Sequence, residues 1–433
     1  MTTAIRWRGT VGSLSDADRR ALFERTTSSD DAIRARTAAI VARVRGEGDA
    51  ALRAMALEFD RVSLESIEVP RAEWQRALDS LAPALRAAME RAARNIERVH
   101  RAFLPSAHQI ESEPGIVIGR RPDPLGRVGV YAPGGRAAYP SSVLMGVVPA
   151  RVAGVREVIV CSPPSAGGGL PSDVVLAAAL LAGADRVFAL GGAGAVAAMA
   201  YGTETVPRVD RIVGPGNAYV AEAKLQVSSA VAIDSPAGPS ELLVLADASA
   251  SAALVARELL AQAEHDPLAA VVAVTTSLEL AQQVEIEIGM QISAQPRAAI
   301  IAESLAAQGA LLVAASMDEA IAFANDYAPE HLLLVVADTD AVLGRLRNAG
   351  TVFAGASASV AFGDYMSGAN HVLPTGGLAR SYSGLSTLDF VRWTTWQRVS
   401  PEAAAALSHD VGTFADAEGL PGHAAAARAW SGR

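Results

Sequence analysis

The chain has 433 residues, 51% of them hydrophobic, and a formal net charge of −9, so it can bury a large core and is long enough for two or three domains. Its negative charge opposes binding to nucleic acid and to anionic membranes, and we expect neither as a partner. No stretch reaches the roughly 18 uninterrupted apolar residues of a membrane span, and the charged N-terminus does not resemble a secretory signal. The single cysteine, Cys161, lies in the apolar run EVIVC, which fits a buried side chain in a reducing cytoplasm.

The organisation of the chain changes twice along its length. Residues 28–102 are rich in Ala, Arg and Glu with apolar residues at helical spacing, which predicts a helical region. From Gly115 onward, short β-branched runs alternate with Gly/Pro turns and alanine-rich stretches, a pattern that predicts parallel sheets with crossover helices. The alternation begins again at ELLVLAD, so we expect two α/β units joined near AGPSE. After Pro374 the chain is polar and aromatic and then Ala-rich, and we expect no further strands there.

A glycine-rich turn follows the strand-like run RVFAL. In GGAGAVAA, Gly192, Gly194 and Ala197 satisfy the dinucleotide-binding pattern G-x-G-x-x-A at a strand-to-helix turn. The alternative is an ordinary turn in a chain with 37 glycines. An acidic residue about twenty positions further on would support the first interpretation, but GPGNAYVAEAK stands there. This motif therefore leaves both interpretations open.

Two segments place metal-binding and proton-transferring side chains in apolar surroundings. In ALVARELLAQAEHDP, Gln262 and His265 stand three residues apart at the end of an amphipathic helix, so both project from one face. Histidine is the commonest zinc ligand, and an amide oxygen is an acceptable partner. In NDYAPEHLLLVVA, Glu330 and His331 come just before a buried strand, and a carboxylate beside an imidazole suits base catalysis.

Three further segments carry polar residues of the same kinds. They are FGDYMSGANHVLPT with Asp364 and His371, predicted to be a loop, AEGLPGHAAAA with Glu418 and His423, and AGPSELLVLAD with Ser240 and Glu241. Each segment alone has a structural explanation, because a lone histidine is more often a core residue and an exposed glutamate is usually just solvated. For His100, His108 and His409, which lie in ordinary charged or alanine-rich contexts, we keep that structural explanation.

Taken together, the segments resemble the histidinol dehydrogenase family from about residue 28 to the end, in order and with family-like spacing. The resemblance is carried by GRVGVYAPGGRAAYPSSVLM, GPGNAYVAEAK, AGPSELLVLAD, AQAEHDP, NDYAPEHL, GDYMSGANHVLPT, SGLS and AEGLPGHA. It implies an NAD-dependent, two-step oxidation of L-histidinol through the aldehyde to L-histidine, in the cytoplasm.

The resemblance also implies residue roles. Glu330 and His331 would be the catalytic acid/base residues, with His331 as the base and Glu330 activating water. One Zn²⁺ ion per subunit would be bound by Gln262, His265, Asp364 and His423. The substrate would contact Ser240, Gln262, His265, His331, Asp364, Glu418 and His423.

The implied cofactor contacts are Tyr131 and Asn217, together with position 194. Here the chain departs from the family, which usually has GGAQAIAA where this sequence has GGAGAVAA. Gly194 thus replaces a glutamine that touches NAD. The same substitution creates the apparent dinucleotide fingerprint, and it puts that one cofactor contact in question.

The implied fold is α/β, with two incomplete Rossmann-like units of the aldehyde-dehydrogenase type. We expect an N-terminal segment over 1–27, a domain with the zinc and catalytic residues over 28–130 and 241–378, a cofactor domain over 131–240, and a tail over 379–433 that is exchanged across a homodimer with shared active sites.

Two other functions remain open. A paralogous zinc- and NAD-dependent dehydrogenase could act on another small polar alcohol, although the intact EHDP, YAPEH and GDYMSGANH segments disfavour it. A binding or regulatory protein could keep the fold without turnover, but such proteins usually lose a ligand or a base, and every expected one is present here.

Overall fold

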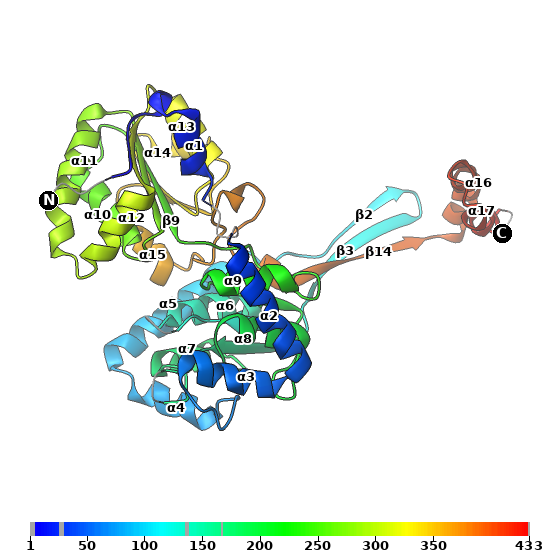
Figure 1. Ribbon diagram of the computed structural model, residues 1–433. Coiled ribbons are helices and arrows are strands. Elements are labelled where there is room, and N and C mark those ends of the chain that lie inside the picture. Colours follow the sequence, from blue (N-terminus) through cyan, green and yellow to red (C-terminus); the bar gives the residue numbers. More distant parts are fainter. Residues whose placement is uncertain (1–4, 26–29, 135–137, 166–167, 432–433) are drawn as a thin grey trace.

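The computed structural model describes residues 5–25, 30–134, 138–165 and 168–431. It contains two α/β domains and a long arm that carries the C-terminus away from both of them (Figure 1). The predicted α/β class is confirmed. Of the segments that carry the family resemblance, only residues 135–137 of GRVGVYAPGGRAAYPSSVLM lie outside the described residues. Within the described part of the chain, no helix combines the length and apolar character needed to cross a bilayer.

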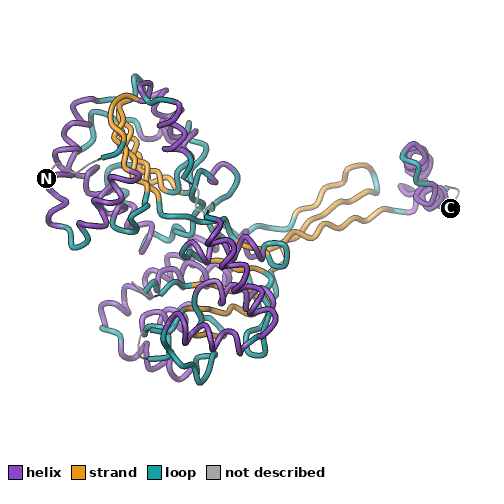
Figure 2. The backbone as a smooth tube through the Cα atoms, viewed as in Figure 1, coloured by secondary structure: helices purple, strands orange, loops and turns teal. Residues whose placement is uncertain are grey.

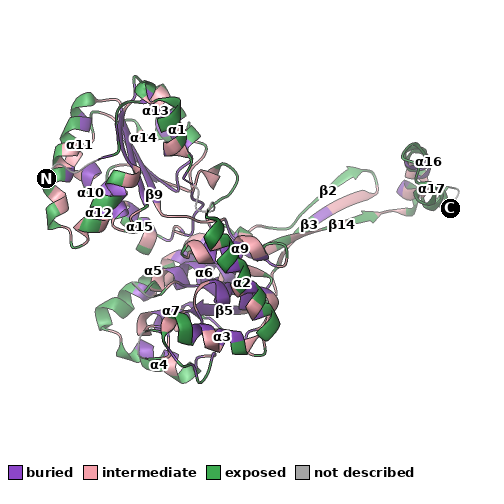
Figure 3. Ribbon diagram, viewed as in Figure 1, coloured by how far each residue is buried: buried purple, intermediate pink, exposed green. Residues whose placement is uncertain are grey.

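One domain is built on a six-stranded parallel sheet. Its strand order is β1 (Trp7–Thr10), β11 (Gly309–Val313), β10 (Ala270–Thr275), β9 (Glu241–Ala246), β12 (His331–Val335) and β13 (Thr351–Ala354). Its helices are α1 (Asp16–Phe23), α10 (Ala252–Ala263), α11 (Leu278–Gln291), α12 (Ala298–Gln308), α13 (Met317–Tyr327), α14 (Thr339–Leu343) and α15 (Val360–Tyr365). The central strands are continuous apolar runs because helices cover both faces of the sheet (Figure 3).

The other domain has a five-stranded parallel sheet. Its strand order is β6 (Arg186–Ala189), β5 (Glu157–Ser162), β4 (Arg127–Tyr131), β7 (Arg211–Val213) and β8 (Ala232–Ile233). Its helices are α2 (Asp31–Glu47), α3 (Asp49–Met55), α4 (Arg71–Ser80), α5 (Pro83–Ala102), α6 (Pro140–Val152), α7 (Asp173–Ala182), α8 (Gly192–Tyr201) and α9 (Ala218–Val227). Cys161 is a free, buried cysteine in β5, as predicted.

The two sheets share one topology. In each, the strand that comes first in its βαβ series lies in the middle, the next two are added on one side and the following two on the other. The order therefore reverses between β4 and β7 in one sheet and between β9 and β12 in the other. Such switch points are where open α/β sheets bind ligands, and this arrangement agrees with the two Rossmann-like units expected from the sequence.

The sheets divide the chain differently from the expected boundaries. Strand β1 pairs with β11, so residues 7–10 belong to the six-stranded sheet and not to a separate N-terminal segment. Helices α2 to α5, which the sequence placed with the zinc and catalytic residues, bury Val44, Leu52, Trp74 and Ile96 in the core of the five-stranded domain. An amphipathic pattern shows that a helix has an apolar face, but it does not show which of two sheets that face covers.

The arm is a three-stranded antiparallel sheet. Its middle strand β3 (Ile116–Pro124) pairs with β2 (His108–Glu113) and with β14 (Val391–Val399). The ribbon extends into solvent and ends in α16 (Pro401–Ala417) and α17 (Pro421–Arg428), as Figures 1 and 2 show.

The expectation of no strand after Pro374 is therefore wrong. Strand β14 looked polar because it lies in a ribbon that is exposed on both faces, so it lacks the apolar alternation of a core strand. Its tryptophans are explained by contacts with β3. Trp396 faces Gly119 across the pair, and the Arg120 guanidinium lies 3.6 Å from the centre of the Trp393 ring, a cation–π contact.

Candidate active site

Four of the five polar segments meet at the amino edge of the six-stranded sheet. Ser240 immediately precedes β9, Glu330 immediately precedes β12, and His331 is the first residue of β12. Gln262 lies in the last turn of α10, and His265 follows two residues after that helix, ahead of β10. Because β9, β10 and β12 are neighbouring parallel strands, their amino ends bring these side chains together.

The His331 ring is buried and fixed from one side. Its Nδ1 lies 2.9 Å from the Glu241 carbonyl oxygen and 3.3 Å from Glu330 Oε2. A carbonyl oxygen can only accept, so in the neutral ring Nδ1 carries the proton and Nε2 carries the lone pair. Nε2 is buried without a hydrogen-bond partner, 3.6 Å from Asp364 Oδ1. The ring therefore presents an unoccupied proton-accepting atom.

The Glu330 carboxylate is buried beside this ring. Its Oε2 accepts a hydrogen bond of 2.7 Å from the Glu241 backbone N–H. Burial raises the pKa of Glu330 above its usual range. Burial opposes the charged form of His331 as well, but the negative charges of Glu330 and Asp364 outweigh it and raise the pKa of His331 well above that of an ordinary histidine. The raised pKa makes the neutral His331 ring a stronger base, and it means that the ring must release a proton before Nε2 can accept one from a ligand.

Glu241 holds this pair and was not predicted as a site residue. Its carboxylate accepts two hydrogen bonds of 3.0 Å from Arg25 and one of 2.6 Å from the Gly376 N–H. Arg25 also donates to the Tyr327 carbonyl, 2.9 Å away, and its guanidinium lies 3.4 Å from the centre of the Tyr327 ring. Glu241 stands in one of the five polar segments. No local pattern marks Arg25, which is remote in sequence.

Three of the predicted metal ligands lie together in one chain. The Gln262 amide is buried and its Nε2 has no hydrogen-bond partner. The His265 Nδ1 lies 3.5 Å from Ser240 Oγ. Loss of solvation around the ring lowers the pKa of His265, against the opposing effect of the Asp364 charge, and so favours the neutral ring that binds metals. Asp364 lies in the short helix α15, not in a loop as predicted. An imidazole, a carboxylate and an amide, which would bind through its oxygen, are a donor set that fits zinc.

The fourth predicted ligand is elsewhere. His423 lies in α17 and Glu418 follows α16; both are exposed, on the helices at the far end of the arm (Figure 1). Consistent with this, the described residues contain no group of three or more His, Cys, Asp or Glu side chains placed to hold a metal ion. Within one chain the site lacks the residues of this segment.

The segment after Asp364 joins the two domains. His371 Nδ1 lies 3.0 Å from the Asp364 carbonyl oxygen, and its Nε2 lies 3.4 Å from Ser142 Oγ on α6. The buried Asn370 amide donates to the Met145 carbonyl on the same helix, at 2.8 Å. His371 was noticed in the sequence but was given no role. The structure places it between Asp364 and the five-stranded domain.

The three histidines that were given no functional role lie in other elements: His100 in α5, His108 in β2 and His409 in α16.

A cavity of about 270 Å³ opens at the carboxyl edge of the five-stranded sheet, beside its switch point. Tyr131, Asn217 and Gly194, the three predicted cofactor positions, all line it. The glycine-rich turn before α8 forms part of the wall, and the Gly192 N–H donates to the Tyr131 hydroxyl at 3.0 Å. Helix N-termini at this position of a Rossmann-like sheet favour phosphate groups.

The GPGN turn is fixed beside Tyr131 by a buried ion pair. Lys224 pairs with Asp234, and these two side chains hold the Gly214 carbonyl and N–H respectively, at 3.1 and 2.7 Å. Gly214 has φ +119°, and a Cβ there would lie 2.1 Å from the Tyr131 carbonyl oxygen, so only glycine fits. This clamp positions Asn217, which caps α9 at the cavity wall.

Gly194 packs closely against α3. A Cβ at this position would lie 3.3 Å from Met55 Sδ and 3.7 Å from Leu52 Cδ2. A glutamine, as in the usual family sequence, would need Met55 to move. Met55 lines the same cavity and occupies the space next to Gly194.

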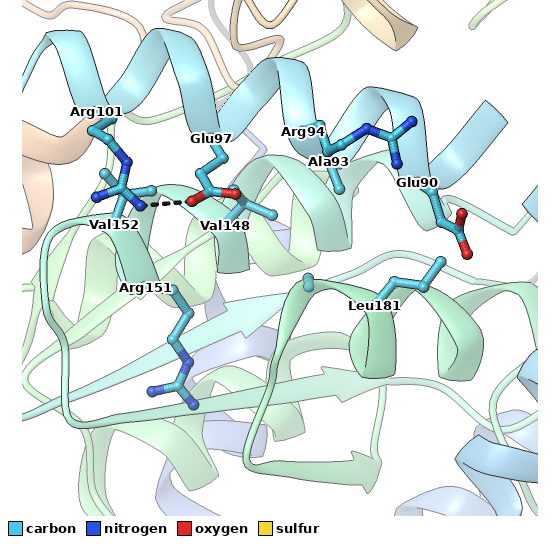
Figure 4. A pocket seen from close by; sticks show the side chains of 10 residues that line it. Glu90, Ala93, Arg94, Glu97, Arg101, Val148, Arg151, Val152 and Leu181 are labelled. Atoms are coloured by element: carbon cyan, nitrogen blue, oxygen red, sulfur yellow. Dashed lines mark hydrogen bonds and ion pairs between the residues drawn. The ribbon is translucent and has the colours of Figure 1, made fainter. Parts of the chain in front are cut away.

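Another cavity, of about 400 Å³, lies between α5, α6 and α7 (Figure 4). It is lined by charged side chains such as Arg94, Arg101 and Glu97, of which the last two form an ion pair of 2.6 Å. It contains none of the predicted site residues. Most of its charged side chains form ion pairs with neighbouring side chains of the same domain.

The fold and the site define an α/β enzyme with a buried carboxylate–imidazole pair on one domain and a cavity at the carboxyl edge of a Rossmann-like sheet on the other. The histidinol dehydrogenase family model matches residues 23–430, and the chain belongs to the histidinol dehydrogenase family.

Individual relatives agree with this assignment. The chain is 48% identical over 420 residues to the histidinol dehydrogenase of Methanosarcina mazei, covering 97% of this chain and 96% of that protein. It is 50% identical over 416 residues to that of Halobacterium salinarum, covering 96% and 97%. The crystal structure of histidinol dehydrogenase from Elizabethkingia anophelis superposes with a TM-score of 0.93 at 34% identity, covering 98% of each chain.

We predict that Arg25→Met destabilises the protein by roughly 3–5 kcal/mol, because it leaves the Glu241 carboxylate buried without its partner. Arg25→Lys should be more stable than Arg25→Met but less stable than wild type, since lysine cannot form the bidentate hydrogen bonds of the guanidinium. Denaturant unfolding measures both. The double variant Arg25→Met/Glu241→Gln removes both charges and should cost less than Arg25→Met alone. Equal costs for the single and double variants would show that the stranded charge is not the cause.

Proposed function

We propose that this enzyme oxidises L-histidinol through L-histidinaldehyde to L-histidine, with NAD as the oxidant and Zn²⁺ in the site. These are the last steps of histidine biosynthesis, and we place the enzyme in the cytoplasm. The observation that carries the proposal is the buried Glu330–His331 pair, whose His331 Nε2 lacks a partner. Support comes from relatives named histidinol dehydrogenase that match nearly the whole chain.

In the first oxidation His331 would be the proton acceptor. The Glu241 carbonyl holds its Nδ1 proton, so Nε2 can take the proton of the substrate hydroxyl. NAD bound beside Tyr131 and Asn217 would supply the chemistry of hydride acceptance. The glycine-rich turn and Asn217, which line that cavity, would position the dinucleotide.

In the second oxidation Glu330 would deprotonate water, which adds to the aldehyde to form the hydrate. Its buried carboxylate has a raised pKa, and it lies next to the ring that serves as base in the subsequent step. His331, which holds the proton from the first oxidation, would return it to the aldehyde oxygen as water adds, and would then accept the proton of the hydrate hydroxyl. A second NAD molecule would supply hydride acceptance for this step. Adjacent groups with separate roles let one site perform both oxidations without release of the aldehyde.

Zn²⁺ would bind and orient the substrate through the nitrogen atoms of its imidazole and amine. Gln262, His265 and Asp364 of one subunit, with His423 of the partner subunit, would hold the metal. Ser240 lies 3.5 Å from His265 and would contact the substrate there. Glu418 of the partner subunit would add a further carboxylate, which suits a cationic substrate.

A paralogous dehydrogenase that acts on another small polar alcohol is the second candidate. The same base, water-activating and metal-type residues would serve it, because none of them by itself recognises an imidazole. A binding protein without turnover is disfavoured by the intact Glu330–His331 geometry. Activity with histidinol, compared with a panel of amino and sulfonated alcohols, distinguishes the three.

We predict that limiting histidinol yields about two NADH per molecule consumed, with little free aldehyde, because one base can serve both oxidations. NADH absorbance and chromatography of the products measure the ratio. L-histidinaldehyde supplied as substrate should yield about one NADH and serves as the control. A ratio of one with histidinol would contradict the two-step reaction.

We predict that His331→Asn lowers both half-reactions by on the order of 10²–10⁴, the usual cost of a lost general base. Glu330→Gln should spare alcohol oxidation and impair aldehyde oxidation, since only the second step consumes water. Single-turnover kinetics with histidinol and with the aldehyde separate the steps. If Glu330→Gln blocked alcohol oxidation and spared aldehyde oxidation, the roles would be reversed.

The arm supports a homodimer with shared sites. Its terminal helices expose large apolar side chains, including Phe414 with 71% of its surface accessible. These helices also carry His423 and Glu418, which lie far from the amino edge of their own six-stranded sheet (Figure 1). An arm that buries its apolar face on a second copy could deliver both residues to the site of that copy.

We predict that His423→Ala and His331→Asn proteins, each inactive, regain activity when mixed after reversible dissociation. In a hybrid dimer one shared site collects both defects and the other none, so an equal mixture should reach about a quarter of wild-type activity.

Each parent variant treated alone is the control, and mass spectrometry confirms the hybrids. Elemental analysis gives a second measurement, because His423→Ala protein should lose bound zinc. Hybrids that stay inactive would mean that each site is built from a single chain.

A further inference from the structure

The cofactor cavity contains a carboxylate that no sequence motif indicated. Asp60 ends the π-helical turn Ala56–Asp60, which continues α3, and it lines the cavity together with Tyr131 and Asn217. Its side chain is half-buried. Burial raises the pKa of the Tyr131 hydroxyl, and the negative charge of Asp60 adds to that rise. Burial raises the pKa of Asp60. A desolvated carboxylate on the wall of a cavity is costly unless a ligand hydrogen-bonds to it.

The chemistry of Asp60 suits one part of a dinucleotide. In Rossmann-type sites an acidic residue accepts hydrogen bonds from the ribose hydroxyls, and its charge excludes a 2′-phosphate. That residue usually lies about twenty positions after the glycine-rich turn, but here the corresponding segment is GPGNAYVAEAK, which forms the GPGN turn and the start of α9. In this chain a carboxylate reaches the cavity wall from the helical region before the sheet, namely Asp60.

A positive charge lines the same cavity and would have the opposite effect. Arg36 on α2 is exposed, and its guanidinium lies 5.7 Å from the ring centres of both Phe59 and Tyr219. Solvent screens an exposed charge more strongly than a half-buried one. Asp60 should therefore dominate recognition while it is charged, and Arg36 should matter once Asp60 is neutralised.

We infer that Asp60 selects NAD over its 2′-phosphorylated form by accepting hydrogen bonds from the ribose hydroxyls and repelling the phosphate. The inference rests on the proposed function, because it requires a nicotinamide dinucleotide in this cavity. It assigns to the turn after α3 a part of cofactor recognition that the sheet itself does not provide.

Direct binding tests the inference without turnover. NADH and NADPH are titrated into the intact enzyme in the absence of histidinol, with NADH or NADPH fluorescence as the signal. Wild-type protein should prefer NADH. Asp60→Asn should bind NADH about tenfold more weakly, as expected for a lost charge-assisted hydrogen bond, and should bind NADPH more tightly than wild type does.

Matched variants identify the cause. Glu58 lies two residues before Asp60, is exposed, and does not line the cavity. Glu58→Gln removes the same charge as Asp60→Asn and should leave both affinities unchanged. Asp60→Glu should restore the preference for NADH in part. Arg36→Met added to Asp60→Asn should abolish the gain in NADPH binding.

The outcomes separate the two claims. A ratio of NADH to NADPH affinity that is the same in Asp60→Asn and wild type, with thermal melts showing both folded, overturns the role of Asp60 and leaves the proposed function intact. Equal changes in the Glu58→Gln control also overturn it, because the effect would then be one of net charge. Wild-type protein that binds neither dinucleotide contradicts both the inference and the use of NAD.

Discussion

The buried contact between Arg25 and Glu241 is the constraint on which the candidate active site depends. Both side chains are almost fully inaccessible, and the two hydrogen bonds between them neutralise a charge that could not otherwise remain in the core. With its side chain held by Arg25, Glu241 uses its backbone for the site: its N–H binds the Glu330 carboxylate and its carbonyl fixes the His331 ring. The proposed proton transfer at this edge would therefore depend on Arg25, a residue from the N-terminal part of the chain.

The two halves of the proposed reaction site lie on different domains, one at the amino edge of its sheet and the other at the carboxyl edge. The proton-transferring pair lies at the amino ends of β9 and β12, whereas the cavity for the cofactor lies at the carboxyl ends of β4, β6 and β7. Neither domain alone holds both. The segment from Asp364 to His371 links them, because it carries a predicted metal ligand and binds α6 of the other domain through His371 and Asn370. The packing of the two domains against each other therefore also sets the position of Asp364, which lies at the end of α15.

Much of this could be predicted from the sequence, because the relevant signals were local. Continuous apolar runs indicated the parallel strands, and histidines and carboxylates next to such runs marked the segments that meet at the sheet edge. What could not be predicted depends on packing between distant parts of the chain. Arg25 has no distinguishing neighbours and acquires its role only by burial against Glu241. The helices over 31–102 carry an apolar face that fits either sheet, and β14 lacks a core pattern because the arm is exposed. Asp60 was missed for the same reason, since its turn reaches the cavity only after α3 packs on α8.

The arm of the described chain exposes strand edges and apolar side chains that a partner would cover. Strands β2 and β14 are the edges of its sheet, and free strand edges are a liability that proteins normally cover. The terminal helices add exposed apolar residues such as Phe414 and Leu420 next to Glu418 and His423. Apolar surface on an extended arm is stabilising only if a partner buries it. The partner that we propose is a second copy, because the proposed site of each copy lacks the metal ligand His423 and the substrate-contacting carboxylate Glu418, and the end of the arm carries both. Burial of the arm and completion of the site would then be a single event, so that the folded dimer, and not the monomer, is the catalytic unit.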